Sequence, residues 1–182
     1  MDNHRALFLI QQIYVTTFSL TNKLQIKGDG YFEHLTSRQF MVIAAILHLP
    51  ENKTTINNIA RKLGTTKQSL KKLITIIENK GYVTTVPSQL DKRAVNIKIT
   101  EAGKQVIKEC DETSIKFFAD ISKDFSIEEM ETLWNLLKKL YRFDGEEQDG
   151  FEEEVQYKID QIQSDAQTKA LNEFERIRNE GK

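Results

Sequence analysis

The sequence predicts a mainly α-helical fold of the α+β class, in which one small β-hairpin lies between helices. Three observations predict it. Apolar residues recur at the three- and four-residue intervals of amphipathic helices. Two segments rich in β-branched residues flank a single polar turn. Capping residues and glycines separate the segments, so that each predicted element has a start and an end.

Size and composition are those of a soluble globular protein. The chain has 182 residues, of which 39% are hydrophobic and 29% are charged. No apolar run has the length of about 18 residues that a membrane-spanning helix needs. The N-terminal residues lack the basic and then apolar order of a secretory signal. We therefore expect a cytoplasmic protein.

The first predicted helix covers residues 5–27 and is apolar on more than one face. Such width indicates burial against a second subunit, because a helix packed only within its own chain needs one apolar stripe. Gly28 and Gly30 are expected to end it. A capping box formed by Thr36 and Gln39 then predicts a helix that continues to Leu47.

Two short amphipathic helices follow, joined by a tight turn. The first starts at Thr55 and the turn contains Gly64, which tolerates the left-handed conformation that stops a helix. Thr66 is expected to cap the second helix, and Gly81 to end it. Each helix has one apolar stripe: Ile56, Ile59, Ala60 and Leu63 in the first, and Leu70, Leu73, Ile74 and Ile77 in the second. The pair is therefore predicted to be a helix-turn-helix.

The hairpin and three further segments complete the expected architecture. Residues 82–86 and 94–99 are predicted strands, and residues 87–93 form a charged turn between them. Thr100 is expected to cap a long helix, and a capping box of Ser126 with Glu129 to open another. Residues 155–180 are polar with a thin apolar stripe, which predicts a helical but weakly anchored tail. A hairpin that follows a helix-turn-helix makes a winged helix-turn-helix lobe.

Charge is distributed unevenly along the chain. The formal net charge is -1, but residues 53–108 carry a net charge of +9 and residues 145–182 a net charge of -6. A basic segment of this density usually faces a polyanion. A lysine-rich solvated surface explains the same charge equally well. Charge alone therefore leaves both interpretations open.

The outward face of the second short helix carries side chains suited to reading DNA. Lysine can donate to guanine, glutamine can pair with adenine, and hydroxyls can contact bases or phosphates. The first turns of such a helix reach the base edges of the major groove. The candidate DNA-binding residues of this segment are Thr65, Thr66, Lys67, Gln68, Ser69, Lys71, Lys72 and Thr75. The alternative is a solvated helix face that is merely poor in acids.

The tip of the predicted hairpin supplies a second candidate contact, formed by Asp91, Lys92 and Arg93. Arg93 is expected to enter a minor groove, where narrow A·T-rich sequence concentrates negative potential. An aspartate this close to DNA would be repelled, so we expect Asp91 to orient the Arg93 guanidinium. A surface hairpin with a weak ion pair is the alternative interpretation.

Five segments of the chain resemble the multiple antibiotic resistance regulator (MarR) family. They are residues 55–64 (TINNIARKLG), 66–74 (TKQSLKKLI), 78–83 (ENKGYV), 90–95 (LDKRAV) and 99–104 (ITEAGK). The resemblance covers about residues 5–142, and the acidic tail departs from it. It implies a homodimeric transcriptional regulator, more often a repressor, which binds a pseudo-palindromic operator and is often released by a small ligand or by thiol oxidation. By position it implies that Thr66, Lys67, Gln68, Ser69, Lys71 and Lys72 are recognition-helix contacts, with Asp91 and Arg93 as the wing pair.

The apolar surplus on the terminal helices also predicts a homodimer. Phe8, Phe117, Phe118, Trp134 and Tyr141 lie outside the central lobe, which has its own small core. Two-fold symmetry would place two recognition helices about 34 Å apart, one turn of duplex. A larger monomeric helical core is the alternative. The expected division is an N-terminal dimerisation helix (1–35), a DNA-binding lobe (36–104), C-terminal dimerisation helices (105–144) and an acidic extension (145–182).

Other functions have less support in the sequence. The histidines His4, His34 and His48 are too scattered for a metal site, and no catalytic or phosphate-binding motif is present, so we expect no enzyme and no cofactor. The single cysteine, Cys110, is flanked by acids that disfavour a reactive thiolate. A second hypothesis remains, in which the acidic tail binds a partner protein or folds over the basic lobe and competes with DNA.

Overall fold

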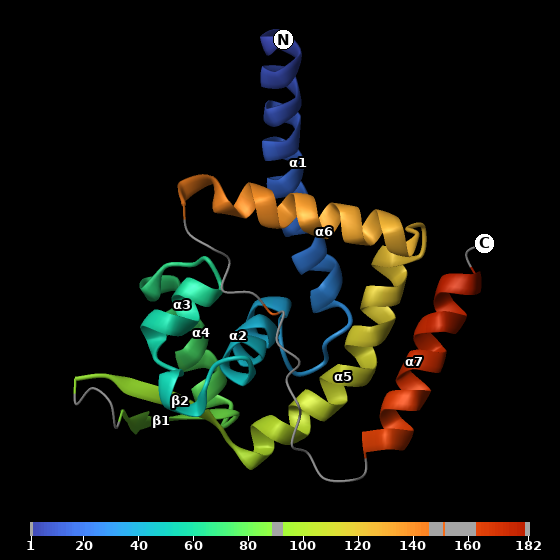
Figure 1. Ribbon diagram of the computed structural model, residues 1–182. Coiled ribbons are helices and arrows are strands. Elements are labelled where there is room, and N and C mark those ends of the chain that lie inside the picture. Colours follow the sequence, from blue (N-terminus) through green and yellow to red (C-terminus); the bar gives the residue numbers. More distant parts are fainter. Residues whose placement is uncertain (1, 89–92, 146–150, 152–162, 181–182) are drawn as a thin grey trace.

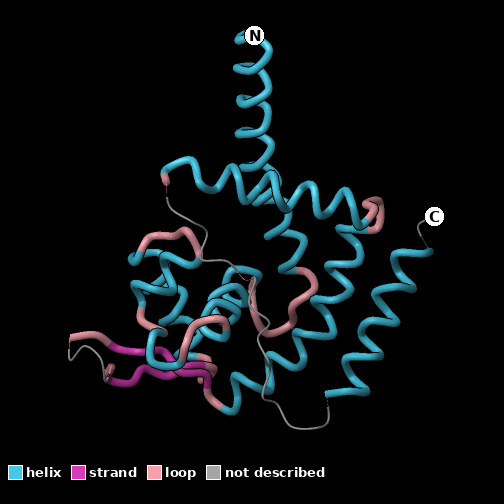
Figure 2. The backbone as a smooth tube through the Cα atoms, viewed as in Figure 1, coloured by secondary structure: helices cyan, strands magenta, loops and turns pink. Residues whose placement is uncertain are grey.

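The computed structural model describes residues 2–88, 93–145, 151 and 163–180 (Figure 1). Helices dominate it, and its two strands form one antiparallel hairpin (Figure 2). The predicted fold class is confirmed. In chain order the elements are α1 (Asn3–Asp29), α2 (Ser37–Leu47), the 3-10 turn η1 (Glu51–Lys53), α3 (Ile56–Lys62), α4 (Lys67–Asn79), β1 (Val83–Pro87), β2 (Val95–Ile99), α5 (Glu101–Ser122), α6 (Ile127–Tyr141), the 3-10 turn η2 (Arg142–Asp144) and α7 (Gln163–Glu180).

The helices begin at the capping residues that the sequence indicates. Thr36 and Gln39 bond reciprocally at the start of α2, and Ser126 and Glu129 do the same at the start of α6. The Thr100 hydroxyl accepts the Gly103 N–H, at 3.0 Å, and caps α5. These side chains satisfy backbone donors that have no partner within the helix, so each helix has a defined first residue.

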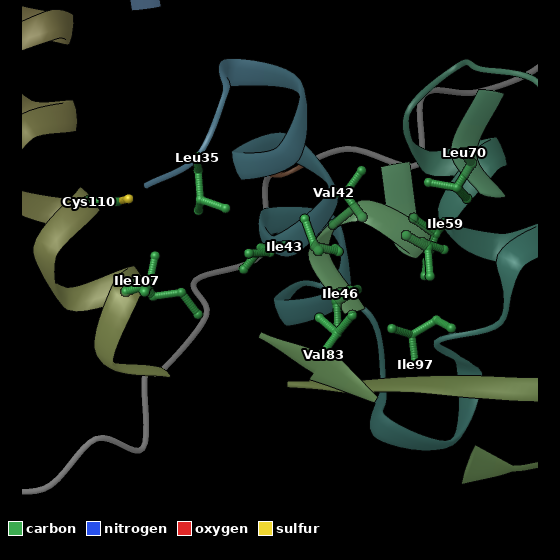
Figure 3. Close-up of a cluster of buried hydrophobic side chains, with 14 of the residues drawn as sticks. Leu35, Val42, Ile43, Ile46, Ile59, Leu70, Val83, Ile97, Ile107 and Cys110 are labelled. Carbon is green, nitrogen blue, oxygen red and sulfur yellow. The ribbon is translucent and has the colours of Figure 1, made fainter. Parts of the chain in front are cut away.

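The lobe of residues 36–104 has a single core cluster, shared by α2, α3, α4 and the hairpin (Figure 3). It continues into the segment before α2 and the first turns of α5, and Phe32 and Val106 are also buried in it. These buried residues anchor the first turns of α5 to the lobe, because apolar side chains would be exposed to water if those turns moved away. The residues labelled in Figure 3 are Leu35, Val42, Ile43, Ile46, Ile59, Leu70, Val83, Ile97, Ile107 and Cys110.

The N-terminal helix projects from the rest of the chain (Figure 1). Its apolar side chains are exposed. Tyr14 is 63% exposed and Phe18 is 61% exposed, although both belong to the wide apolar surface expected from the sequence. Trp134 of α6 is 49% exposed. These exposures agree with the expected apolar surplus on the terminal helices.

One aromatic residue of that surplus is buried within the protomer. We expected Phe117 to face a partner, but it is only 9% exposed, and its ring lies 5.4 Å from the Tyr31 ring. The Phe117 ring packs beside α1 at Gly28, where an added Cβ would lie 3.6 Å from it, in ordinary van der Waals contact. Phe117 therefore joins α5 to α1 within one chain.

The C-terminal extension is better anchored than we expected. The helix α7 packs along α5, and its Phe174 and Ile177 are partly buried. The Arg178 guanidinium donates to the Phe125 carbonyl at 2.5 Å. The thin apolar stripe is thus sufficient for docking, because α5 supplies the complementary surface. Among the residues that the structure describes, no helix combines the length and apolar character needed to cross a bilayer.

Candidate nucleic-acid interface

The fourth helix, α4, buries most of its apolar residues on one face, although Ile76 is 43% exposed. Leu70, Ile74 and Ile77 are buried against the lobe core, while Leu73 is partly buried. The opposite face is exposed and carries Lys67, Gln68, Ser69, Lys71, Lys72 and Thr75. The structure therefore brings the sequence-selected residues of this helix together on one solvent-facing surface, with Thr66 exposed and Thr65 half-buried at its start.

Each of the two short helices ends in the same backbone motif. After α3, the Thr65 N–H donates to the Ala60 carbonyl at 2.9 Å, and Gly64 has a φ of 58°. After α4, the Tyr82 N–H donates to the Ile77 carbonyl at 3.0 Å, and Gly81 has a φ of 78°. Both are Schellman motifs, which favour glycine at the left-handed position. The first motif fixes the angle at which α4 leaves α3, and thus aims the polar face of α4 outward.

The hydroxyls at the N-terminus of α4 form a chain that ends at Ser69. Thr66 Oγ1 accepts the Ser69 N–H at 3.2 Å and donates to Ser69 Oγ at 3.0 Å. The Thr66 proton is thereby used within the protein, whereas the Ser69 hydroxyl proton remains available to an outside acceptor. We therefore expect Ser69 to be the donor toward DNA and Thr66 to serve mainly as the helix cap.

Replacing Thr66 by alanine is expected to destabilise the fold by about 1 kcal/mol, because the N-cap acceptor of α4 is lost. Urea denaturation followed by circular dichroism measures this change. Thr66→Ser keeps the hydroxyl and should stay within a few tenths of wild type. Equal stability of the alanine variant and wild type would contradict the capping role.

The β2 strand of the wing hairpin is bonded, on its side away from β1, to η1 and to Thr54, the residue that follows η1. The Ile97 N–H donates to the Thr54 carbonyl at 3.0 Å, and Lys98 Nζ lies 2.7 Å from Glu51 Oε1. The hydrogen bond from Lys98 lowers the pKa of Glu51. These contacts pair β2 with a third short extended segment. They fix the position of β2 relative to the lobe. The sequence analysis did not identify them, because the partners are more than 40 residues apart.

The tip of the wing is only partly described. Arg93 is exposed at the start of the return toward β2. Asp91 and Lys92 lie outside the described residues, so the expected pairing of Asp91 with Arg93 stays a prediction.

A residue that the sequence analysis passed over is Glu78, whose carboxylate accepts hydrogen bonds from Thr85 of β1. Its signal in the sequence is the presence of an acid in a strongly basic lobe.

Comparisons with known proteins agree with this geometry. A family model described as MarR family matches residues 35–94. "Transcriptional activatory protein BadR" of Rhodopseudomonas palustris is 28% identical over 137 residues, which are 72% of this chain and 78% of the relative.

Two solved structures have the same fold. The S. aureus MepR–DNA complex aligns with a TM-score of 0.63 at 20% identity, covering 70% of this chain and 95% of that chain. The organohalide-sensing regulator RdhR-CbdbA1625, bound to 2,4-dichlorophenol, aligns with a TM-score of 0.65 at 18% identity, covering 74% and 80% respectively. Identities this low establish a shared winged-helix fold and nothing finer.

Proposed function

We propose that the chain is a transcriptional regulator of the MarR family, whose model matches residues 35–94, and that it binds a pseudo-palindromic operator in double-stranded DNA as a homodimer. This proposal makes the chain a regulator rather than an enzyme. The observation that carries the proposal is the exposed face of α4, where lysines, a glutamine and hydroxyls lie opposite a fully apolar stripe. A helix fits the major groove, and these side chains match the donors and acceptors of its base edges.

The roles of the individual side chains follow from their chemistry and position. Lys67 and Gln68 lie in the first turn of α4, the part of a recognition helix that reaches the bases. Lys71 lies one turn further along the same exposed face. Arg93 of the wing is assigned to an adjacent minor groove. Lys72, which is also exposed on α4, is assigned to a phosphate contact, which raises affinity for any sequence.

The terminal helices are assigned to dimerisation, with residues 1–35 and 105–144 flanking the lobe of residues 36–104. Support comes from the uncovered apolar side chains of α1 and α6, which a second copy related by a two-fold axis would cover. Such a dimer presents two α4 helices to successive major grooves. Operator symmetry then mirrors the symmetry of the protein.

A small-molecule effector is also part of the proposal. A pocket of about 250 Å³ lies between the segment before α2 and the middle of α5, and its lining includes His34, Glu109 and Cys110. His34 Nε2 lies 3.5 Å from Glu109 Oε2 in this lining. The similar regulator RdhR-CbdbA1625 has been solved with 2,4-dichlorophenol bound. A ligand that changes the angle between α5 and the lobe would change the spacing of the two recognition helices.

The sign of regulation stays a prediction. We propose repression, as the resemblance to the family implies, whereas the name of the relative BadR describes an activator. The acidic tail is not assigned a competing role. Its helix α7 packs on α5, on the side away from α4 (Figure 1), which does not favour direct competition with DNA for the α4 face.

The proposal is tested by selecting bound sites from a pool of random duplexes with the full-length protein. We expect an enriched motif with two inverted half-sites whose centres lie about 10 bp apart, one helical turn. A parallel selection at high salt should lose the motif, because binding releases counterions from phosphate. Absence of any enrichment at low salt would refute DNA binding, and an asymmetric motif would refute the symmetric dimer.

A further inference from the structure

The free edge of β1 is closed by a carboxylate from the recognition helix α4. Glu78 Oε1 accepts a hydrogen bond from the Thr85 backbone N–H at 3.2 Å and another from the Thr85 hydroxyl at 3.1 Å. Thr85 is the partner of Ile97 in the hairpin register, and the Ile97 N–H points outward to Thr54. Thr85 and Ile97 are therefore a non-hydrogen-bonded pair, and the Thr85 N–H points away from β2. Glu78 supplies the acceptor that β2 does not.

Two physical effects act against a glutamate at this position. Glu78 lies in the last turn of α4, where the helix dipole disfavours a negative charge. It is also one of only three acids in residues 53–108, the segment with a net charge of +9. Its negative charge there opposes the approach of a polyanion. Neither helix stability nor DNA affinity accounts for this residue, whereas the paired bonds to Thr85 do.

We propose that Glu78 is a positioning residue that sets the direction of the wing relative to the recognition helix. This inference rests on the proposed function. The hairpin is held along β2 by η1, through the Lys98–Glu51 pair, and β1 is held by the burial of Val83 at its start and by the Glu78 hydrogen bonds at Thr85. Without the Glu78 bonds, the part of β1 beyond the buried Val83 has no hydrogen bond to α4, so the outer half of the hairpin can change its direction. Arg93 and the polar face of α4 then no longer meet one duplex in a fixed register.

Replacing Glu78 changes the DNA affinity in opposite directions if the residue positions the wing and if it acts only through its charge. Glu78→Ala removes a negative charge, and by electrostatics alone it should tighten DNA binding. Positioning predicts the opposite, a weakening of about threefold to tenfold, which is the size expected for a lost hydrogen bond. Glu78→Gln lacks the charge but keeps an acceptor oxygen, so it should bind as tightly as wild type or tighter. The matched control Glu101→Gln removes another acid from the same lobe and should not weaken binding.

A double-mutant cycle with Arg93→Ala provides the second readout. If Glu78 acts through the wing, Arg93→Ala should have less than half its wild-type effect when it is made in Glu78→Ala. Affinities are measured by fluorescence anisotropy on the selected operator. Each dissociation constant is calculated with the concentration of protein that is active in DNA binding, which a stoichiometric titration measures. A partly unfolded fraction of the variant then does not change the measured affinity. A general loss of stability leaves the effect of Arg93→Ala unchanged.

The outcomes are distinct for the two proposals. Binding by Glu78→Ala that equals or exceeds wild type overturns the positioning role, and so do independent effects of Glu78→Ala and Arg93→Ala. If wild type does not bind duplex DNA at all, the proposed function fails first. If Arg93→Ala weakens binding while Glu78→Ala does not, only the inference about Glu78 fails.

Discussion

The double substitution Gln68→Ala/Lys71→Ala is expected to lower affinity for the selected operator by about 100-fold or more. Each good contact between a side chain and a base contributes about 1–3 kcal/mol of discrimination. Both side chains are exposed on α4, three residues apart and therefore on one face of the helix. Binding to random-sequence duplex should fall much less, because it depends on the phosphate contacts that the variant mostly retains.

The chain offers a matched control for this variant on another helix. Gln105 and Lys108 are exposed on α5 at the same three-residue spacing, so Gln105→Ala/Lys108→Ala removes the same residue types and the same charge. Fluorescence anisotropy on operator and random duplexes measures all three proteins. We expect the α5 variant to discriminate operator from random sequence as wild type does. If the α4 and α5 variants lost the same affinity, α4 would not be the recognition helix.

The helix-turn-helix could be predicted from sequence because all of its determinants are local. The stripe of Leu70, Ile74 and Ile77 repeats at the helical period, and Thr66 caps the helix that carries it. Gly64 supplies the left-handed residue of the turn. Each of these signals operates within about four residues, the range over which backbone hydrogen bonds form in a helix. The exposed face of α4 then follows by elimination from the buried one.

Long-range contacts could not be predicted in the same way. The sequence predicts that Phe117 faces a partner subunit, but its ring packs against Tyr31 and beside Gly28 within the protomer. The docking of α7 on α5 depends on the fit of two surfaces that are distant in sequence. The contact of Glu78 with Thr85 spans only seven residues, yet it depends on the turn at Gly81 and on the register of the hairpin. The periodicity of apolar residues does not indicate which of these segments come into contact.

A single copy of this chain leaves an unusual amount of apolar surface in water. The side chains of α1 are exposed on every face over residues 3–23, although many of them are large and apolar. On α6, Leu136 is more than half exposed, and Leu133 and Leu137 are nearly half exposed. Monomeric proteins rarely expose contiguous apolar patches of this kind. Burial of such surface stabilises association by roughly 25 cal/mol per Å² before the entropic cost of binding.

Introducing one charge on each of these two faces is therefore expected to separate the dimer. Ile10→Glu/Leu137→Glu should sediment with the mass of one chain, 21.1 kDa, because a glutamate buried in an apolar interface has no partner for its charge. The matched control Gln12→Glu/Asn135→Glu adds the same two charges at exposed polar positions of the same helices and should remain dimeric. Because Ile10 and Leu137 are exposed in the protomer, both variants should keep the wild-type helical content.

Loss of the dimer should also remove most of the operator affinity, even though both substitutions lie outside the DNA-binding lobe. Two linked recognition helices gain about 100-fold to 10,000-fold over one, because the second binds at a high effective concentration. We expect the separated chain to contact a single half-site, so that mutating the other half-site no longer changes its affinity. Sedimentation and anisotropy on whole and half operators measure the two effects together. A variant that is monomeric yet binds the whole operator like wild type would show that each α4 acts independently of its partner.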